Sequence, residues 1–195
     1  MKRLKEIERI DSIPSKEVNY DKFVDKNAKI ASTFKTKSET KIDSIDIKWY
    51  DCGKIQRIIS YNNDNPIGYL ALKKFRDGYQ VYTLGVKPEA RRSGLAEKMY
   101  DFVLSKTKLY SDHQQTPESR KLWIKLSRKY KVMGFDELDD SLFTVKPNGD
   151  EFESLDKDKQ VYSDNSLDGK LLVMKENKKS QNIFENWKRF TKEKV

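Results

Sequence analysis

The sequence predicts a mixed α/β (α+β) fold in which helices flank a mostly antiparallel sheet. Three runs rich in β-forming residues, 54–64, 66–75 and 79–86, are joined by short turn signals. After residue 92 the apolar residues instead recur with the period of a helix. The expected order is therefore helices, a three-strand meander, a helix, a short strand, a second helix and further strands.

Residues 1–41 are predicted to form a helical N-terminal segment. Apolar residues from Tyr20 to Phe34 fall close to a helical stripe, and Pro14 marks a break before them. The Lys/Ser/Thr-rich stretch TFKTKSETK, residues 33–41, is predicted to be a loop or linker. In the meander that follows, Asp77-Gly78 between two β-rich runs is a hairpin signal.

Two amphipathic helices are expected after the meander. The first places Leu95, Met99 and Phe102 on one face. The second follows a short strand at residues 108–112, with Thr116 as its N-cap and Pro117 at its first position.

The C-terminal part is predicted to contain strands and a last helix. The strand candidates are SLFTV, residues 141–145, and GKLLVMK, residues 169–175. Residues 176–195 are predicted to form an amphipathic helix around IFENWKRF. That helix could dock a partner or a second copy of the chain, which would allow self-association, although packing on the chain's own sheet is favoured.

Composition narrows the class of protein. The 195 residues suit one domain with decorated ends, and no internal repeat is visible. Cys52 and His113 are the only cysteine and histidine, so an internal disulfide and a structural zinc site are excluded and no metal is expected. No apolar run approaches membrane length, and the N-terminus alternates charged with apolar residues. We therefore expect a cytoplasmic protein that does not span a membrane.

The net charge of +9 is unevenly distributed. Residues 85–131 hold 12 Lys and Arg against 5 Asp and Glu, whereas residues 132–174 hold 4 against 11. This asymmetry indicates either a basic surface for an anionic ligand beside an acidic one, or two segments that neutralise each other or are solvated. Both interpretations stay open at this point.

The turn from Arg91 to Ala96, between the last strand of the meander and the next helix, is a candidate phosphate site. A helix N-terminus offers unpaired N–H donors and a partial positive charge. Gly94 allows a ligand to approach the backbone closely, and Arg91 and Arg92 add charge-assisted hydrogen bonds. The stretch matches neither G-x-G-x-x-G nor a Walker-type loop, so dinucleotide binding and Walker-type binding are not supported.

The segment LGVKPEARRSGLAEKMYDFV, residues 84–103, resembles motif A of the GCN5-related N-acetyltransferases (GNAT). In that motif an L-x-V-x-P strand precedes [QR]-x-x-G-x-[GA] and a helix. Downstream, TPESRKLWIKL resembles a divergent form of the family's N-x-x-A-x-x-L-Y-x-K-L segment, with Ser119 for Ala and Trp123 for Tyr. The SDHQQTPESRKLWIKL stretch is similar to phage-encoded members, which would place the protein in a host cytoplasm. The expected domains are 1–41, an acetyltransferase-like domain at 42–175, and 176–195.

The resemblance implies acetyl-CoA as cosubstrate, bound where two neighbouring parallel strands of the sheet splay apart. By position these strands are residues 79–86 and 108–112. The resemblance implies that Gly85 marks a bulge that opens the pairing. The implied cofactor-binding residues are Leu84, Gly85 and Val86 along the pantetheine; Arg91, Arg92, Ser93, Gly94, Leu95 and Ala96 around the pyrophosphate; and Ser119 and Trp123 on the second helix.

Two catalytic roles that the family often fills lack their usual residues here. The strand GYQVYTLGVK contains no carboxylate to act as base, and Trp123 stands where a tyrosine acid is expected. The catalytic candidates are Asp112, His113, Tyr82 and Tyr110, although His113 is as readily a surface histidine. Proximity alone could suffice for a nucleophilic acceptor.

Three functions are compatible with these features. The first is an acetyl-CoA-dependent N-acetyltransferase. The acidic tract at residues 136–168 predicts a cationic amine acceptor for it, such as a polyamine, a lysine or a protein N-terminus. The second is a GNAT-fold binding or structural protein, for example a phage particle or effector component, without transfer activity. Nucleic-acid binding ranks last, because no nucleic-acid motif accompanies the charge.

Overall fold

The computed structural model describes residues 19–112, 115–159, 161 and 171–174. The chain divides into two compact units, of which the first ends at Val103 and the second begins at Leu104. The predicted α/β class with a mostly antiparallel sheet flanked by helices is confirmed. The domain boundaries expected from the sequence stay predictions.

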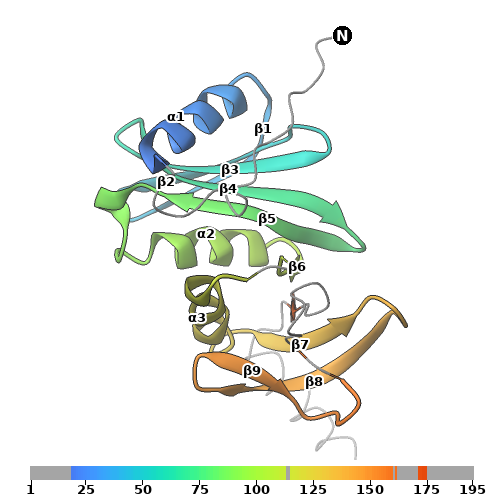
Figure 1. The fold of residues 1–195 in the computed structure, drawn as a ribbon. Helices are drawn as coiled ribbons and strands as arrows, with labels where there is room; N and C mark the ends of the chain where they lie inside the picture. The colour runs from blue at the N-terminus through green and yellow to red at the C-terminus, as the bar shows by residue number, and fades with distance from the viewer. Residues whose placement is uncertain (1–18, 113–114, 160, 162–170, 175–195) are drawn as a thin grey trace, which may run out of the picture. The chain divides into compact units, whose positions relative to one another are not determined.

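The first unit begins with helix α1, Tyr20–Ala31 (Figure 1). The side chain of Asn19 caps it by accepting a hydrogen bond of 3.0 Å from the N–H of Lys22. Its inward face carries the small or apolar residues Val24, Ala28 and Ala31. The helix predicted for this segment is thus confirmed for residues 20–31.

An antiparallel meander of five strands follows α1. The strands are β1 (Thr36–Ile42), β2 (Ile45–Tyr50), β3 (Ile55–Asn62), β4 (Asn65–Phe75) and β5 (Gly78–Val86). The predicted three-strand meander is confirmed as β3 to β5. The prediction of a loop at residues 33–41 is wrong, because β1 occupies most of it.

Tight turns with left-handed residues fix the register of the meander. Asn63 and Asp64 both have positive φ between β3 and β4, as a type I′ hairpin requires. Between β4 and β5 the turn residues are Arg76, also at positive φ, and Asp77, since Phe75 pairs with Gly78. The predicted hairpin is therefore present one residue earlier than the Asp-Gly signal suggested.

Helices cover both faces of the meander (Figure 1). On one face α1 packs on a cluster of buried residues that includes Tyr50, Ile59, Tyr69 and Ala71. On the other face lies α2, Leu95–Leu104. A Cβ on Gly68 of β4 would stand only 3.0 Å from Leu95 Cδ2, so this glycine lets α2 approach the sheet.

The described residues of the second unit form a helix and five strands. They are β6 (Leu109–Tyr110), α3 (Pro117–Leu126), β7 (Lys131–Asp136), β8 (Ser141–Asn148), β9 (Glu151–Ser154) and β10 (Leu171–Met174). Their antiparallel pairing follows the order β6, β10, β7, β8, β9. The strands predicted at residues 108–112, 141–145 and 169–175 are present as β6, β8 and β10, and the helix predicted at 176–195 lies outside the described residues.

Thr116 and Pro117 start α3 as predicted. The Thr116 hydroxyl accepts a hydrogen bond of 3.2 Å from the N–H of Ser119, and Pro117 occupies the first helical turn. In the part of the chain that the structure describes, no helix is long and apolar enough to cross a membrane.

Candidate acetyl-CoA site

The connection from β5 to α2 is a short, tightly bonded turn. The N–H of Lys87 donates to the carbonyl oxygen of Ile67 at 3.0 Å, which extends the β4–β5 pairing past Val86. A single 3₁₀ turn, η2 (Pro88–Ala90), then leads into the loop. Figure 1 shows this connection beside the start of α2, at the edge of the first unit.

The loop from Arg91 to Gly94 holds two left-handed residues. Arg92 has φ +63° and Gly94 has φ +76°. Alternation of this kind turns successive N–H groups toward one side of the chain, an arrangement that binds anions. Only glycine adopts such a φ without strain, and a Cβ on Gly94 would meet nothing within 4 Å. Gly94 is thus required by its backbone conformation, with open space beside it.

Helix α2 adds its own N-terminus to this loop. The first hydrogen bond of the helix runs from the N–H of Lys98 to the carbonyl of Gly94 at 3.0 Å. The N–H groups of Leu95 and Ala96 precede that bond and have no partner within the helix. The Ser93 hydroxyl donates back to the Ala90 carbonyl at 2.8 Å, which holds the loop in shape.

The two arginines of the loop have different surroundings. Arg91 folds back: its Nε donates to the Val86 carbonyl at 3.2 Å, and its guanidinium lies 4.4 Å from the centre of the Tyr20 ring. Arg92 is exposed, on a left-handed backbone. Arg91 therefore attaches the loop to β5 and α1. We accordingly expect the side chain of Arg92, and not that of Arg91, to bind phosphate.

An ion pair between a buried lysine and an exposed aspartate provides a second link between α1 and this connection. Lys87 Nζ lies 2.7 Å from an oxygen of Asp25, and the Lys87 side chain is only 7% exposed. The sequence pattern indicated neither Asp25 nor Tyr20 as a residue of the site. A lysine directly after a buried strand was the one signal that could have drawn attention to Lys87.

The backbone that would run along pantetheine is regular on its β4 side. Leu84, Gly85 and Val86 pair in order with Leu70, Tyr69 and Gly68. The expected bulge at Gly85 is absent from this pairing. Instead Ala71 pairs with Thr83 and Leu72 with Val81, which leaves Tyr82 as the extra residue. In the sequence, the glycine at position 85 was the only signal for a bulge. A bulge, however, requires an extra residue without a partner on the neighbouring strand, and that residue need not be glycine.

Tyr82, one of the catalytic candidates, is half-buried and packs against the cluster of buried residues under α1. The other candidates belong to the second unit. Tyr110 is buried in β6, Asp112 is half-buried after it, and His113 lies outside the described residues. The opening expected between residues 79–86 and 108–112 would join the two units and stays a prediction.

On α3, the expected cofactor residues are differently exposed. Trp123 is completely buried, which fits a packing residue and not a proton donor at a surface. Ser119 is half-buried, and its N–H bonds the Thr116 cap.

Residues 25–115 match the family model described as the acetyltransferase (GNAT) family. Residues 25–115 therefore form a GNAT acetyltransferase segment. This family uses acetyl-CoA as its cosubstrate, and the matched residues include the whole loop from Arg91 to Ala96. Similarity to phage-encoded GNAT proteins in particular stays a prediction.

Solved structures similar to this chain share little sequence with it. One is a GNAT-family protein from Bacteroides thetaiotaomicron, with 16% identity, a TM-score of 0.39 and coverage of 69% of this chain and 71% of that chain. Another is a GNAT acetyltransferase from Elizabethkingia anophelis with acetyl-CoA bound, with 11% identity, a TM-score of 0.41, and coverage of 68% and 99%. A third is the IAA acetyltransferase from Bacillus cereus, with 12% identity, a TM-score of 0.37, and coverage of 62% and 77%. No curated protein matches the sequence.

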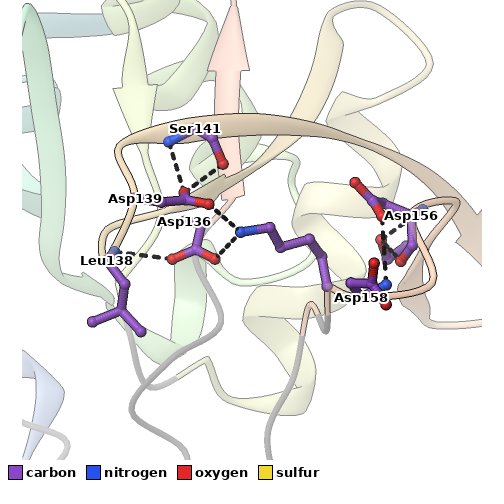
Figure 2. Close-up of polar contacts among 8 residues, drawn as sticks. Asp136, Leu138, Asp139, Ser141, Asp156 and Asp158 are labelled. Carbon is purple, nitrogen blue, oxygen red and sulfur yellow. Dashed lines mark hydrogen bonds and ion pairs between the residues drawn. The ribbon is translucent and has the colours of Figure 1, made fainter.

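Several described carboxylates of the acidic tract form ion pairs within their own unit. Lys159 pairs with both Asp136 and Asp139, with Nζ at 2.5 Å from an oxygen of each. Figure 2 shows these two aspartates side by side. Hydrogen bonds from Lys159 hold the pKa values of both carboxyl groups below their usual range, and the pKa of Lys159 is raised in return. These two carboxylates therefore share one cation, which offsets one of their two negative charges.

Three further pairs occupy acidic residues of the tract. They are Arg120 with Glu151, Lys121 with Asp150 at 3.1 Å, and Lys146 with Glu153 at 2.6 Å. Two of these pairs join the basic residues of α3 to the acidic tract. Of the two interpretations of the charge asymmetry, mutual neutralisation thus applies to α3, while the loop at Arg92 keeps its positive charge exposed. Among the described residues, no group of His, Cys, Asp and Glu could hold a metal ion.

Proposed function

We propose that this protein transfers the acetyl group of acetyl-CoA to an amine by direct attack on the thioester. The observation that supports this most is the loop from Arg91 to Ala96. Two left-handed residues, an adjoining helix N-terminus and an exposed arginine together form a seat for the pyrophosphate of CoA. The match of residues 25–115 to the GNAT family supports the thioester as the acetyl source.

In this proposal different residues bind different parts of CoA. The N–H groups of residues 92–96 and the Arg92 guanidinium bind the pyrophosphate, while Arg91 holds the loop in place. The extended backbone of Leu84 to Val86 aligns the pantetheine arm. Ser119 and Trp123 contribute from α3, Trp123 by packing.

Proton transfer falls to a small set of candidates. An amine must be neutral to attack, and the leaving thiolate needs a proton. Strand β5 carries no carboxylate, so Tyr82 from β5 and Tyr110, Asp112 and His113 from the second unit are the groups proposed for these roles. A bound and oriented acceptor would need less help, because proximity lowers the barrier by itself.

The proposed acceptor is an amine that is cationic at neutral pH, such as a polyamine, a lysine or a protein N-terminus. The acidic tract supports this less strongly than its composition suggests. Five of its described carboxylates, at residues 136, 139, 150, 151 and 153, already pair with lysine or arginine. The acceptor panel should therefore include neutral and zwitterionic amines as well.

The test is thiol release from acetyl-CoA with such a panel, together with calorimetric titration of CoA. Gly94→Glu places a carboxylate where the pyrophosphate would bind and should abolish CoA binding and turnover. Gly53→Glu is the matched control, because Gly53 has the same φ of +76° and equally open space beside it. Equal CoA affinity in the Gly94 variant and the wild type would refute the seat, and absence of turnover with every amine would refute catalysis.

A second function, that of a binding or structural protein, is favoured by one observation. Trp123 stands in the position expected for the acid and is fully buried, and β5 offers no base. On this hypothesis CoA binds without turnover. The same two measurements separate the hypotheses, since CoA binding with no thiol release across the panel supports the second one.

A further inference from the structure

Arg57, Tyr69 and Cys52 form a polar cluster inside the apolar layer beneath α1. Arg57 is 3% exposed, Tyr69 is 0% exposed and Cys52 is 4% exposed. Arg57 lies on β3 between Ile55 and Ile59, on the face that α1 covers. A guanidinium so deeply buried is unusual, since charged side chains are rarely buried without a partner.

The strand register brings these groups together. Tyr69 pairs with Ile59, and Ala71 pairs with Arg57, so the tyrosine and the arginine are diagonal neighbours on one face. Ala71 presents only a methyl group beside the guanidinium, and Tyr82 follows on β5, opposite Ala71 and Leu72. The Tyr69 ring packs edge-on against Phe23 of α1, with 5.3 Å between the ring centres.

Two buried polar atoms of this cluster lack a hydrogen-bond partner. Arg57 Nε and the Tyr69 hydroxyl are buried, and neither makes a hydrogen bond in the structure. Among the described residues no carboxylate forms an ion pair with Arg57. Asp51, which is close in sequence, is exposed and accepts hydrogen bonds from Gln56 and from the N–H of Gly53.

Neither neighbour supplies the missing negative charge. Burial raises the pKa of Tyr69 to about 12, with a partial offset from the adjacent guanidinium. Burial likewise raises the pKa of the Cys52 thiol. Both groups are therefore neutral near pH 7, and the Tyr69 hydroxyl is available as a donor.

The donor set fits one class of anion. The guanidinium of Arg57 and the phenol of Tyr69 are neighbouring N–H and O–H donors on one face of the sheet. A carboxylate accepts two N–H bonds in plane with a guanidinium. A single negative charge balances Arg57, whereas a doubly charged phosphate would leave a net charge in apolar surroundings. We propose that Arg57 and Tyr69 bind the carboxylate of a small molecule beneath α1.

Two sources could supply that carboxylate. One is an amino-acid-like acceptor, which would rest on the proposed acetyl transfer. The other is a free carboxylic acid that acts as an effector. Tyr82, a candidate proton carrier beside the cluster, is the residue through which either could influence the reaction.

The test measures thermal unfolding of the full chain without acetyl-CoA. Acetate, succinate and glycine are compared with chloride at equal ionic strength. At about ten times Kd, a carboxylate should raise Tm by about 3 to 6 °C. Arg57→Met should abolish this rise, while Arg128→Met, at an exposed arginine, should leave it intact.

Tyr69→Phe provides a second test in case the Arg57→Met variant does not fold. It removes only a hydroxyl that has no partner, so it should fold, and it should bind the carboxylate about ten-fold more weakly. Acetylation assays then separate the sources. If amino acids are acetylated and Arg57→Met raises their KM, the carboxylate belongs to the acceptor; if carboxylates raise Tm but no amino acid is acetylated, it belongs to an effector.

A rise in Tm no greater than that with chloride would overturn the proposal. So would an equal rise in wild type and Arg57→Met, because binding would then not involve the guanidinium. Neither result depends on acetyl transfer. A failed amine panel would leave the carboxylate measurements fully interpretable.

Discussion

Substitution of Arg91 and Arg92 by methionine should have opposite consequences for stability and for CoA affinity. Arg91 makes a cation–π contact with Tyr20 and donates a hydrogen bond to Val86. At a protein surface a cation–π contact contributes about 0.5–1 kcal/mol to the free energy of unfolding, and a hydrogen bond contributes about 1 kcal/mol. Arg91→Met should therefore cost about 1.5–2 kcal/mol, which lowers Tm by about 3 to 8 °C in a chain of this size.

Arg92→Met should instead act on binding. Arg92 is exposed, and methionine in its left-handed conformation is no more strained than arginine, so Tm should change by less than about 1 °C. Loss of one charge-assisted hydrogen bond to phosphate is worth about 1.5–3 kcal/mol, which weakens CoA binding by about 10- to 100-fold.

Calorimetric titration with CoA and thermal unfolding of both variants provide the two readouts. The double variant Tyr20→Leu, Arg91→Met should lose less free energy of unfolding than the sum of the losses in the two single variants, because both changes remove the same contact. If Arg91→Met weakened CoA binding as much as Arg92→Met and left Tm unchanged, the assignment of Arg91 to positioning would be refuted.

Two further outcomes are expected in the second unit. The pKa values of Asp136 and Asp139 are lower in the folded protein than in the unfolded chain, where they lie near about 4. The two ionised groups therefore stabilise the fold at a pH above about 4, and this stabilisation is lost as the pH falls through the folded-state pKa values. Lys159→Met should therefore flatten the fall in urea midpoint between about pH 5 and pH 2; an unchanged profile would contradict the ion pair. Gly134→Ala should lower the free energy of unfolding, measured with urea, by more than about 2 kcal/mol, because its Cβ would lie 2.1 Å from the Phe143 ring. Adding Phe143→Leu to the same chain should restore part of this free energy.

Local signals in the sequence predicted elements whose stabilising contacts are also local. The α3 start depends on Thr116, Pro117 and the N–H of Ser119, all within four residues. The β4–β5 hairpin likewise depends on its own turn. The loop at Gly94 was found because its shape follows from a glycine and a helix start.

Features that depend on distant residues escaped prediction. Strand β1 has few apolar residues and an exposed, polar pattern, so only its pairing with β2 makes it a strand. The role of Arg91 depends on Tyr20, 71 positions earlier in the chain. Arg57 did carry a signal, since a single charge interrupts an otherwise apolar alternation with Ile55 and Ile59. That its buried Nε makes no hydrogen bond is visible only in three dimensions.

The attachment of Arg91 to α1 makes the N-terminal helix and the loop thermodynamically linked. Linkage is reciprocal: if an intact α1 strengthens CoA binding by a given factor, bound CoA favours the docked helix by the same factor. Amide hydrogens of α1 should then exchange more slowly when CoA is present. A change at Tyr20 or Asp25 should accordingly alter the affinity for the cosubstrate.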